Sequence, residues 1–267
     1  MNMLVCVKQV PDTTEIKIDP VTNTLIRAGV PSILNPFDGY ALEAAARIKD
    51  ADPSAKIVVL SMGPEQAKAV LKESLAIAAD KAYLVSDRAF GGSDTLATSY
   101  IISETIKKVE ELEGKFDIIF CGKQAIDGDT AQVGPEIAEH LGLPQVTYGL
   151  EAEVDGDTVK VKKEVEEGVE VIGVEMPCQL TFTKPAWGPR YPTIKRKMAA
   201  NRAEIPTLTA ADLPTIDLTQ AGLKGSPTKV KKTFVPQKKS GGVKIKEETA
   251  EDSAKKLFQL LSDASII

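Results

Sequence analysis

The sequence predicts an α/β fold: a parallel sheet between two layers of helices (αβα), then an antiparallel ribbon and an extended C-terminal arm. Short apolar runs alternate with helical patterns up to about residue 142, which is typical of a parallel sheet with helices on both faces. From residue 146 the periodicity changes to two. Residues 203–247 are rich in Pro, Gly, Lys and Thr and show little periodicity.

The first half of the chain supplies the parallel strands. A buried strand is expected at residues 3–7, followed by a long excursion with short alternating pieces at 15–18 and 24–28. A helix then begins at "NPFD", with Asn35 as its N-cap and Pro36 at its first position. The remaining elements are expected in alternation: strand 55–62, helix 64–79, strand 81–87, helix 93–112, strand 116–122, and a helix, or a loop and then a helix, over 129–142.

The second half changes character. Segments 146–154, 158–165, 169–176 and 178–183 alternate with period two between turn sequences, so an antiparallel ribbon is expected. Residues 184–202 are basic and interrupted by prolines. The arm ends in a predicted amphipathic helix within 249–267, and we expect it to dock on another chain.

Composition narrows the function classes. The chain has 267 residues, a net charge of −5 and only 5% aromatic residues, so nothing favours nucleic-acid binding. It shows no signal peptide and no apolar run long enough for a membrane span. Three cysteines in or beside apolar runs suggest a reduced, cytoplasmic protein without a metal site. A single histidine, His140, near a helix end disfavours a Ser-His-Asp triad.

The carboxyl edge of the predicted sheet carries the candidate site, because ligands of such sheets bind there. The segments "CVKQVPD", "LSMGP" and "CGKQAIDGDTAQVGP" all follow strands. In the third, glycines at 122, 128 and 134 would allow close approach of the backbone or positive φ, and Thr130 with backbone N–H groups could bind phosphate. Asp127 and Asp129 would repel phosphate, so they are expected to cap amides or hold ribose hydroxyls. A glycine-rich turn with helix caps, or a calcium loop, are the alternatives.

Six motifs taken together carry a resemblance: "VCVKQVPD", "GVPSILNPFD", "ALEAAARIKD", "SMGP", "CGKQAIDGDTAQVGP" and "PRYPTI". The set resembles the β (small) subunit of electron-transfer flavoproteins, most closely the electron-bifurcating kind. The resemblance implies a Rossmann-like adenine nucleotide-binding domain over residues 1–200, including the ribbon and a recognition loop at 184–198. It also implies that residues 201–267 form an arm with a terminal helix that docks on the α subunit.

The resemblance also implies a set of cofactor-binding residues at the strand ends and at "NPFD". They are Cys6, Val10, Pro11, Asp12, Asn35, Pro36, Phe37, Asp38, Met62, Gly122, Lys123, Gln124, Ala125, Ile126, Asp127, Gly128, Asp129, Thr130, Ala131, Gln132 and Val133. Ordinary family members hold structural AMP in this pocket, and bifurcating members hold FAD. Asp38 and the run Ala131-Gln132-Val133 resemble the bifurcating kind, so FAD is expected, with AMP as the alternative.

The implied function is electron transfer without a catalytic side chain. NADH would deliver hydride to FAD in this subunit, and electrons would pass to the α-subunit FAD with an acyl-CoA dehydrogenase, and to ferredoxin or flavodoxin. The implied partner-binding residues are Pro189, Arg190, Tyr191, Ile194, Lys195 and Arg196, with Ile194 as the apolar anchor. Two alternatives stay open: a non-bifurcating β subunit with AMP, and a free-standing adenine nucleotide-binding module.

Overall fold

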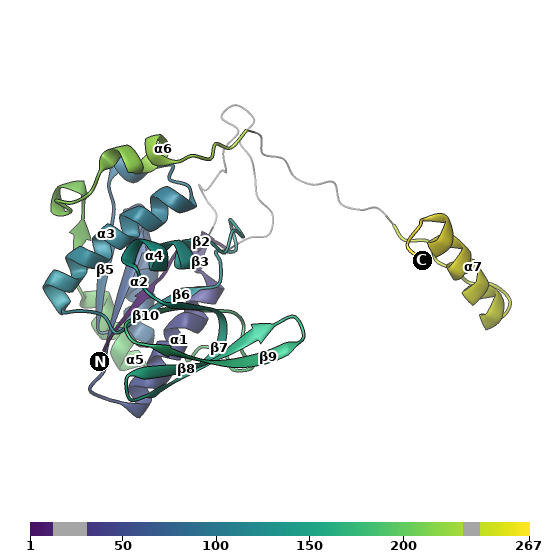
Figure 1. Cartoon of the computed structure of the whole chain (residues 1–267), viewed down its shortest axis with the longest axis horizontal. Helices are drawn as coiled ribbons and strands as arrows, with labels where there is room; N and C mark the ends of the chain where they lie inside the picture. Colours follow the sequence, from purple (N-terminus) through teal and green to yellow (C-terminus); the bar gives the residue numbers. More distant parts are fainter. Residues whose placement is uncertain (13–30, 232–240) are drawn as a thin grey trace. The chain divides into compact units, whose positions relative to one another are not determined.

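The computed structural model describes residues 1–12, 31–231 and 241–267 (Figure 1). The alternating pieces expected at 15–18 and 24–28 lie outside these residues. The chain divides into two compact units, Met1–Lys231 and Lys232–Ile267. The division falls later than the predicted boundary after residue 200, since residues 201–231 belong to the first unit.

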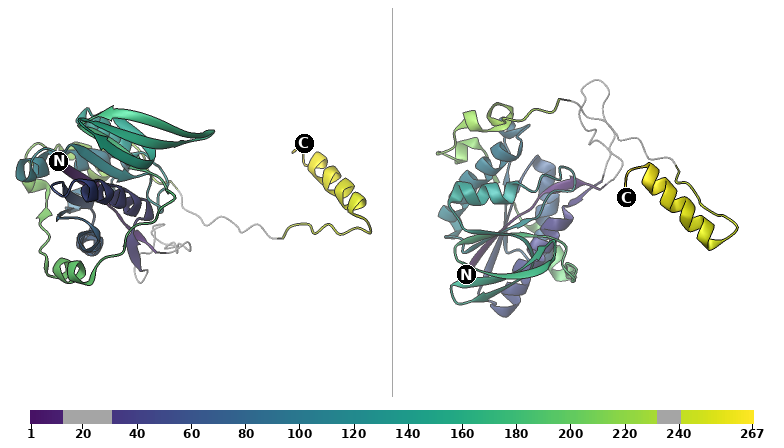
Figure 2. Two further views of the ribbon diagram at one scale, coloured as in Figure 1. Left: turned by 90° about the horizontal axis from the view of Figure 1, so that it is seen from below. Right: turned by 45° about the vertical axis from the view of Figure 1, so that its right-hand side comes forward.

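The first unit is built on a nine-stranded sheet with the order β11-β5-β4-β1-β6-β10-β7-β8-β9. The strands are β1 (Asn2–Cys6), β4 (Lys56–Met62), β5 (Lys81–Val85), β6 (Ile118–Gly122), β7 (Gln145–Asp155), β8 (Thr158–Val165), β9 (Gly168–Glu175), β10 (Cys178–Phe182) and β11 (Thr207–Leu208). The strands from β11 to β7 pair in parallel, and β7, β8 and β9 form the antiparallel ribbon, teal to green in Figure 2. A separate antiparallel hairpin joins β2 (Gln9–Pro11) and β3 (Ser32–Leu34).

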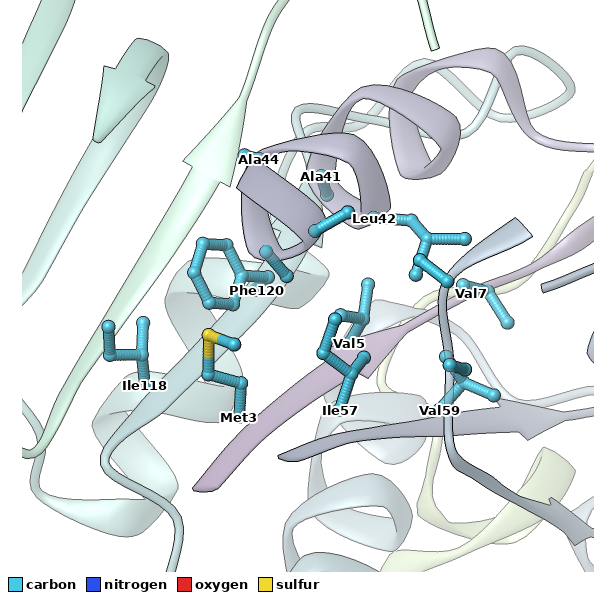
Figure 3. Packing of buried hydrophobic residues seen from close by; sticks show 14 of the residues in the cluster. Met3, Val5, Val7, Ala41, Leu42, Ala44, Ile57, Val59, Ile118 and Phe120 are labelled. Carbon is cyan, nitrogen blue, oxygen red and sulfur yellow. The ribbon is translucent and has the colours of Figure 1, made fainter. Parts of the chain in front are cut away.

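Helices cover both faces of the sheet, which confirms the three-layer prediction. One core places α1 (Pro36–Ala51) and α2 (Lys68–Ile77) against the sheet, and the other places α3 (Thr95–Glu113) and α4 (Val133–Leu141) on the opposite face. Met3 and Val5 of β1 lie directly under α1, between neighbouring side chains of β4 and β6 (Figure 3). Each such side chain contributes roughly 1.5–3 kcal/mol by leaving water. The centre of the sheet is therefore well packed, and the loops at its carboxyl edge start from it.

One strand differs from the prediction. Residues 178–183 were expected in the antiparallel ribbon, but β10 runs parallel and lies between β6 and β7. Every residue of β10 is buried, because helices cover both of its faces. Period-two alternation shows which residues share a face and says nothing of strand direction, so it does not separate an edge hairpin from an inserted parallel strand.

The proline-rich stretch and the arm also contain more regular structure than expected. After Pro192, the hydroxyl of Thr193 accepts a hydrogen bond from the N–H of Arg196 and begins α5 (Ile194–Arg202). Further on, β11 pairs with β5, and α6 (Gly222–Gly225) lies against α3. Short 3₁₀ helices occur in this part at Ala210–Asp212 and Leu218–Gln220, and earlier in the chain at Glu65–Ala67 and Arg88–Phe90.

The second unit contains α7 (Ala250–Asp263), as the sequence predicts. The hydroxyl of Thr249 caps its first turn, and no residue of α7 is buried. Leu257 and Phe258 are exposed on it. Among the helices of the described segments, none has the length and apolar character that crossing a membrane requires.

Candidate functional site

The sheet reverses its strand order beside β1. The chain proceeds from β1 to β4 and β5 on one side and then crosses to β6 on the other side. In open α/β sheets this reversal opens a crevice at the carboxyl ends of the two central strands, where ligands bind. Here those ends are Lys8, which follows β1, and Gly122, the last residue of β6. A ligand is therefore expected to contact the loops that follow these two strands.

Asp38 is buried between the ends of these two strands and bridges them. Its carboxylate accepts hydrogen bonds from the backbone N–H of Lys8 at 2.7 Å and of Gly122 at 3.2 Å. The residue is 6% exposed, and burial raises its pKa to about 7, against the opposing effect of these hydrogen bonds and of the Lys8 charge. Asp38 therefore holds the ends of β1 and β6 in position.

Asn35 occupies the predicted N-cap position of α1, but its side chain makes no cap hydrogen bond. Instead its amide nitrogen donates to the carbonyl of Gln124 at 2.8 Å, and its amide oxygen accepts from the N–H of Ile126 at 3.2 Å. Its own backbone N–H donates to the carbonyl of Lys8 at 2.9 Å. "NPFD" thus ties the β1 exit to the loop after β6.

The loop after β6, residues 123–132, is held by polar side chains from outside the loop and from within it. The amide of Gln124 donates to Asp129 at 2.6 Å, and the ammonium of Lys8 contacts Asp127 at 2.6 Å. Both aspartates therefore have protein partners. Thr130, with its hydroxyl, and Gln132, with its amide, are exposed. No side chain caps α4, whose N-terminus follows. Uncapped N–H groups at a helix N-terminus suit a phosphate.

The glycines of this loop play a different part from the one expected. Positive φ occurs at Asp129 (53°) and Ala131 (54°) rather than at the glycines. At Gly122, a Cβ atom would lie 2.3 Å from the Asp38 carboxylate and 2.7 Å from α1 backbone, so close packing requires glycine there. At Gly128, a Cβ atom would meet nothing within 4 Å. Only Gly128 leaves open space for a ligand.

A cleft lies beside the loop, between the β1 and β4 ends. Its cavity volume is roughly 150 Å³, and it is partly open to solvent. Its lining residues are Lys8, Gln9, Val10, Pro11, Ser32, Met62, Gly63, Pro64, Gln66, Ala67 and Asp127. An apolar wall with a few amide and charged groups is typical of a cofactor site.

The structure brings part of the predicted site into this cleft. Val10, Pro11, Met62 and Asp127 line it. Cys6 instead packs in the core on the α3 and α4 face, and its thiol is hydrogen-bonded to that of Cys121, which with burial raises the pKa of Cys6. Asp12 is exposed at the end of the β2–β3 hairpin and does not line the cleft.

Seven of the lining residues are absent from the predicted site. They are Lys8, Gln9, Ser32, Gly63, Pro64, Gln66 and Ala67. Ser32 belongs to the hairpin partner of β2, and Gln66 and Ala67 belong to the helical turn after "SMGP". That turn follows a strand at the carboxyl edge of the sheet, so its position in the sequence could have predicted that Gln66 and Ala67 line the cleft.

The expected recognition loop is fixed to the body by its arginines. The Arg190 guanidinium contacts Glu43 at 2.8 Å and Asp50 at 2.7 Å, both on α1, and its pKa is raised by these carboxylates. Arg196 donates to the carbonyls of Leu75 and Ala79 at the end of α2. The arginines therefore position the segment.

Apolar side chains are what the segment presents to solvent. Tyr191 is 92% exposed and Ile194 is 82% exposed, and Met198 lies one helical turn after Ile194 with more than half of its surface exposed. Lys195 and Pro189 are also exposed. A convex apolar group of this kind on a well-anchored segment suits a protein partner.

Comparison with known proteins identifies the family of this chain. A family model for the electron transfer flavoprotein domain matches residues 22–213. An electron transfer flavoprotein subunit beta from Megasphaera elsdenii is 57% identical over 95% of this chain and 94% of its own. The same subunit from Clostridium acetobutylicum is 54% identical over 95% of each chain. Subunit CarD of the caffeyl-CoA reductase-Etf complex from Acetobacterium woodii is 47% identical over the whole of both chains.

These matches extend over almost the entire chain, and the matched region includes "NPFD", the loop after β6 and the recognition segment. The alternation of elements in the fold and the matched sequences agree on the family. The chain therefore belongs to the electron transfer flavoprotein family, as one of its β subunits.

Proposed function

We propose that this chain, paired with an electron-transfer flavoprotein α subunit, binds FAD at the carboxyl edge of its sheet and takes part in electron bifurcation. The adenine nucleotide part would lie along the loop after β6, with its phosphates near the uncapped N-terminus of α4. The flavin ring would enter the cleft lined by Val10, Pro11 and Met62. The family membership speaks against the free-standing nucleotide-binding module.

The observation that carries FAD over AMP is the cleft itself. It lies next to the loop, shares Asp127 with it, and has apolar walls flanked by the amides of Gln9 and Gln66. A planar aromatic ring with polar edges fits such walls. AMP has no second ring system to fill this space. A β subunit with structural AMP, the alternative, would leave the cleft without an occupant.

Bound FAD would supply the redox chemistry, accepting hydride from NADH and passing electrons toward the α-subunit FAD and toward ferredoxin or flavodoxin. The protein's own contribution is to hold the site rigid. Asp38 and Asn35 fix the strand ends and the loop, so the site changes little when electrons arrive. None of the described lining residues is placed as an acid, base or nucleophile.

The partner segment is proposed to dock an acyl-CoA dehydrogenase. Tyr191 and Ile194 would enter a pocket of the partner, with Met198 and Lys195 beside them. CarD, by its name, belongs to a complex with caffeyl-CoA reductase, a partner that acts on an acyl-CoA. Localisation in the cytoplasm, docking of α7 on the α subunit, and NADH as the electron donor are parts of the same proposal.

The flavin content of the purified heterodimer tests this function. The protein is denatured, and the released FAD and AMP are separated and quantified per heterodimer. The proposal expects two FAD and no AMP. One FAD with one AMP would instead support the non-bifurcating alternative.

A further inference from the structure

The cleft has a charged pair whose two members differ in what they offer a ligand. Lys8 and Asp127 are the two charged residues among those that line it. The Asp127 side chain is 11% exposed, whereas that of Lys8 is 48% exposed. The carboxylate is therefore largely covered, and the ammonium is the more accessible of the two charges.

Lys8 is fixed at both its backbone and its side chain. Its N–H donates to Asp38 at 2.7 Å, and its carbonyl accepts from the N–H of Asn35 at 2.9 Å. Its ammonium is held by Asp127 at 2.6 Å, which leaves N–H groups to spare because an ammonium has three donors. A cation held in this way acts on a bound ligand without having to reorganise.

From this geometry we propose that Lys8, positioned by Asp127, sets the electrostatic potential of the cleft and with it the reduction potential of the flavin bound there. The inference rests on the proposed function, since it requires FAD in this subunit. Reduction of a flavin takes up two electrons and, near neutral pH, one proton, so the ring gains one negative charge. A fixed ammonium favours that gain, and the covered carboxylate opposes it.

Two substitutions at this one pair separate an electrostatic role from a structural one. Lys8→Met removes the cation, and Asp127→Asn removes the anion, yet both break the same ion pair. If the pair only held the loop in place, both variants would shift the potential in the same direction. An electrostatic role gives shifts of opposite sign.

The experiment is a redox titration of the purified, cofactor-loaded heterodimer. The potential that is followed is that of the FAD proposed for this subunit, resolved from that of the α-subunit FAD. Lys8→Met is expected to lower the reduction potential and Asp127→Asn to raise it. Each change should be about tenfold in the equilibrium constant, or about 30 mV for a two-electron couple. Lys160→Met is the matched control, because Lys160 of β8 is a half-exposed lysine in a similar ion pair, with Asp155 at 2.7 Å, but does not line the cleft; the flavin potential should stay unchanged in this variant.

Shifts of the same sign in both variants, or no shift in either, overturn the inference. If Lys8→Met fails to retain flavin, Lys8→Arg and Asp127→Asn decide: the first keeps the charge and should keep the potential, and the second should still raise it. A lowered or unchanged potential in Asp127→Asn then contradicts the proposal. Failure of the proposed function is recognised separately, because the wild-type heterodimer would release one FAD instead of two.

Discussion

The loop after β6 and the segment around α5 are both held in place by charged side chains, but they present different surfaces. In the loop, Asp127 and Asp129 bind the protein's own lysine and amide groups. In the segment, Arg190 and Arg196 bind carboxylates and carbonyls of α1 and α2. The loop then borders a concave cleft, and the segment presents a convex apolar group.

In both regions, the residues that hold the backbone in place are distinct from the residues that a ligand or partner can contact. The charged residues of the two regions hold the backbone in place. The surfaces that a ligand or partner can contact consist of the other residues. Substitutions of residues that hold the backbone in place should lower the stability of the protein. Substitutions of residues on the exposed surfaces should weaken binding and leave stability nearly unchanged.

Gly122→Ala is expected to cause the largest loss. The new Cβ would lie 2.3 Å from the Asp38 carboxylate and 2.7 Å from the backbone of α1, and neither can move without disturbing the strand ends. A cost of about 3 kcal/mol or more follows from such overpacking. The measurement is the urea unfolding midpoint of the heterodimer.

Gly128 provides the matched comparison in the same loop. Gly128→Ala meets no atom within 4 Å and should change stability by less than about 1 kcal/mol. The bulkier Gly128→Val should likewise fold but retain less nucleotide, because its side chain would occupy ligand space. Equal losses of stability at Gly122 and Gly128, or full nucleotide content in Gly128→Val, would remove the distinction.

Arg190→Met should be the next most damaging change, at about 2–3 kcal/mol. It leaves Glu43, whose side chain is 5% exposed, with Arg47 as its remaining cationic partner, and a buried carboxylate that loses one of its two partners is destabilised. Lys195→Met, five residues later and exposed, should have almost no effect on the unfolding midpoint. Similar midpoints for the two variants would show that Arg190 does not anchor the segment.

Asp38→Asn tests the holding role in the loop region and should cost about 2 kcal/mol near pH 5, since an amide nitrogen would face a backbone N–H. The pKa of Asp38 is raised to about 7 from an ordinary value near 4. The native state therefore binds this proton more tightly, so the stabilising contribution is complete below pH 4 and is lost as the pH rises through about 7. The stability difference between wild type and variant should narrow over that window. Parallel pH profiles would contradict this.

Ile194→Ala should have the smallest effect on stability, less than about 0.5 kcal/mol, because the side chain is already exposed. Its expected effect is on the partner: electron transfer to the acyl-CoA dehydrogenase should fall severalfold, while NADH-linked flavin reduction is unchanged. Val171→Ala, an exposed apolar change on β9, is the control. An unaltered dehydrogenase rate in Ile194→Ala would exclude Ile194 as the anchor.

The sequence predicts most of the fold because local patterns determine it. Apolar runs identify β1, β4, β5 and β6, and Pro36 identifies the start of α1. The direction of β10 was not predictable, since it depends on which strands flank it. The partner of the Asn35 side chain lies 89 residues away at Gln124, a separation that no local pattern reveals.

The candidate site was predicted in outline for the same reason. Strand ends located the loop and the Met62 turn, whereas the inward orientation of Arg190 and Arg196 depends on carboxylates and carbonyls contributed by α1 and α2. Gln66 lines the cleft only because the turn after β4 folds back toward the β2–β3 hairpin, where Gln9 donates to its carbonyl. Such contacts between distant segments are where sequence reasoning ends.

The central claim, that the cleft in this chain binds a flavin ring, is tested most directly by counting flavin in a variant whose cleft is filled. Gln66→Trp places a large ring in the cleft from an exposed position, and Ala69→Trp places the same ring on an exposed position of α2 that does not line it. One FAD per heterodimer is expected in Gln66→Trp, and two are expected in both Ala69→Trp and the wild type. Two FAD retained in Gln66→Trp would contradict the central claim.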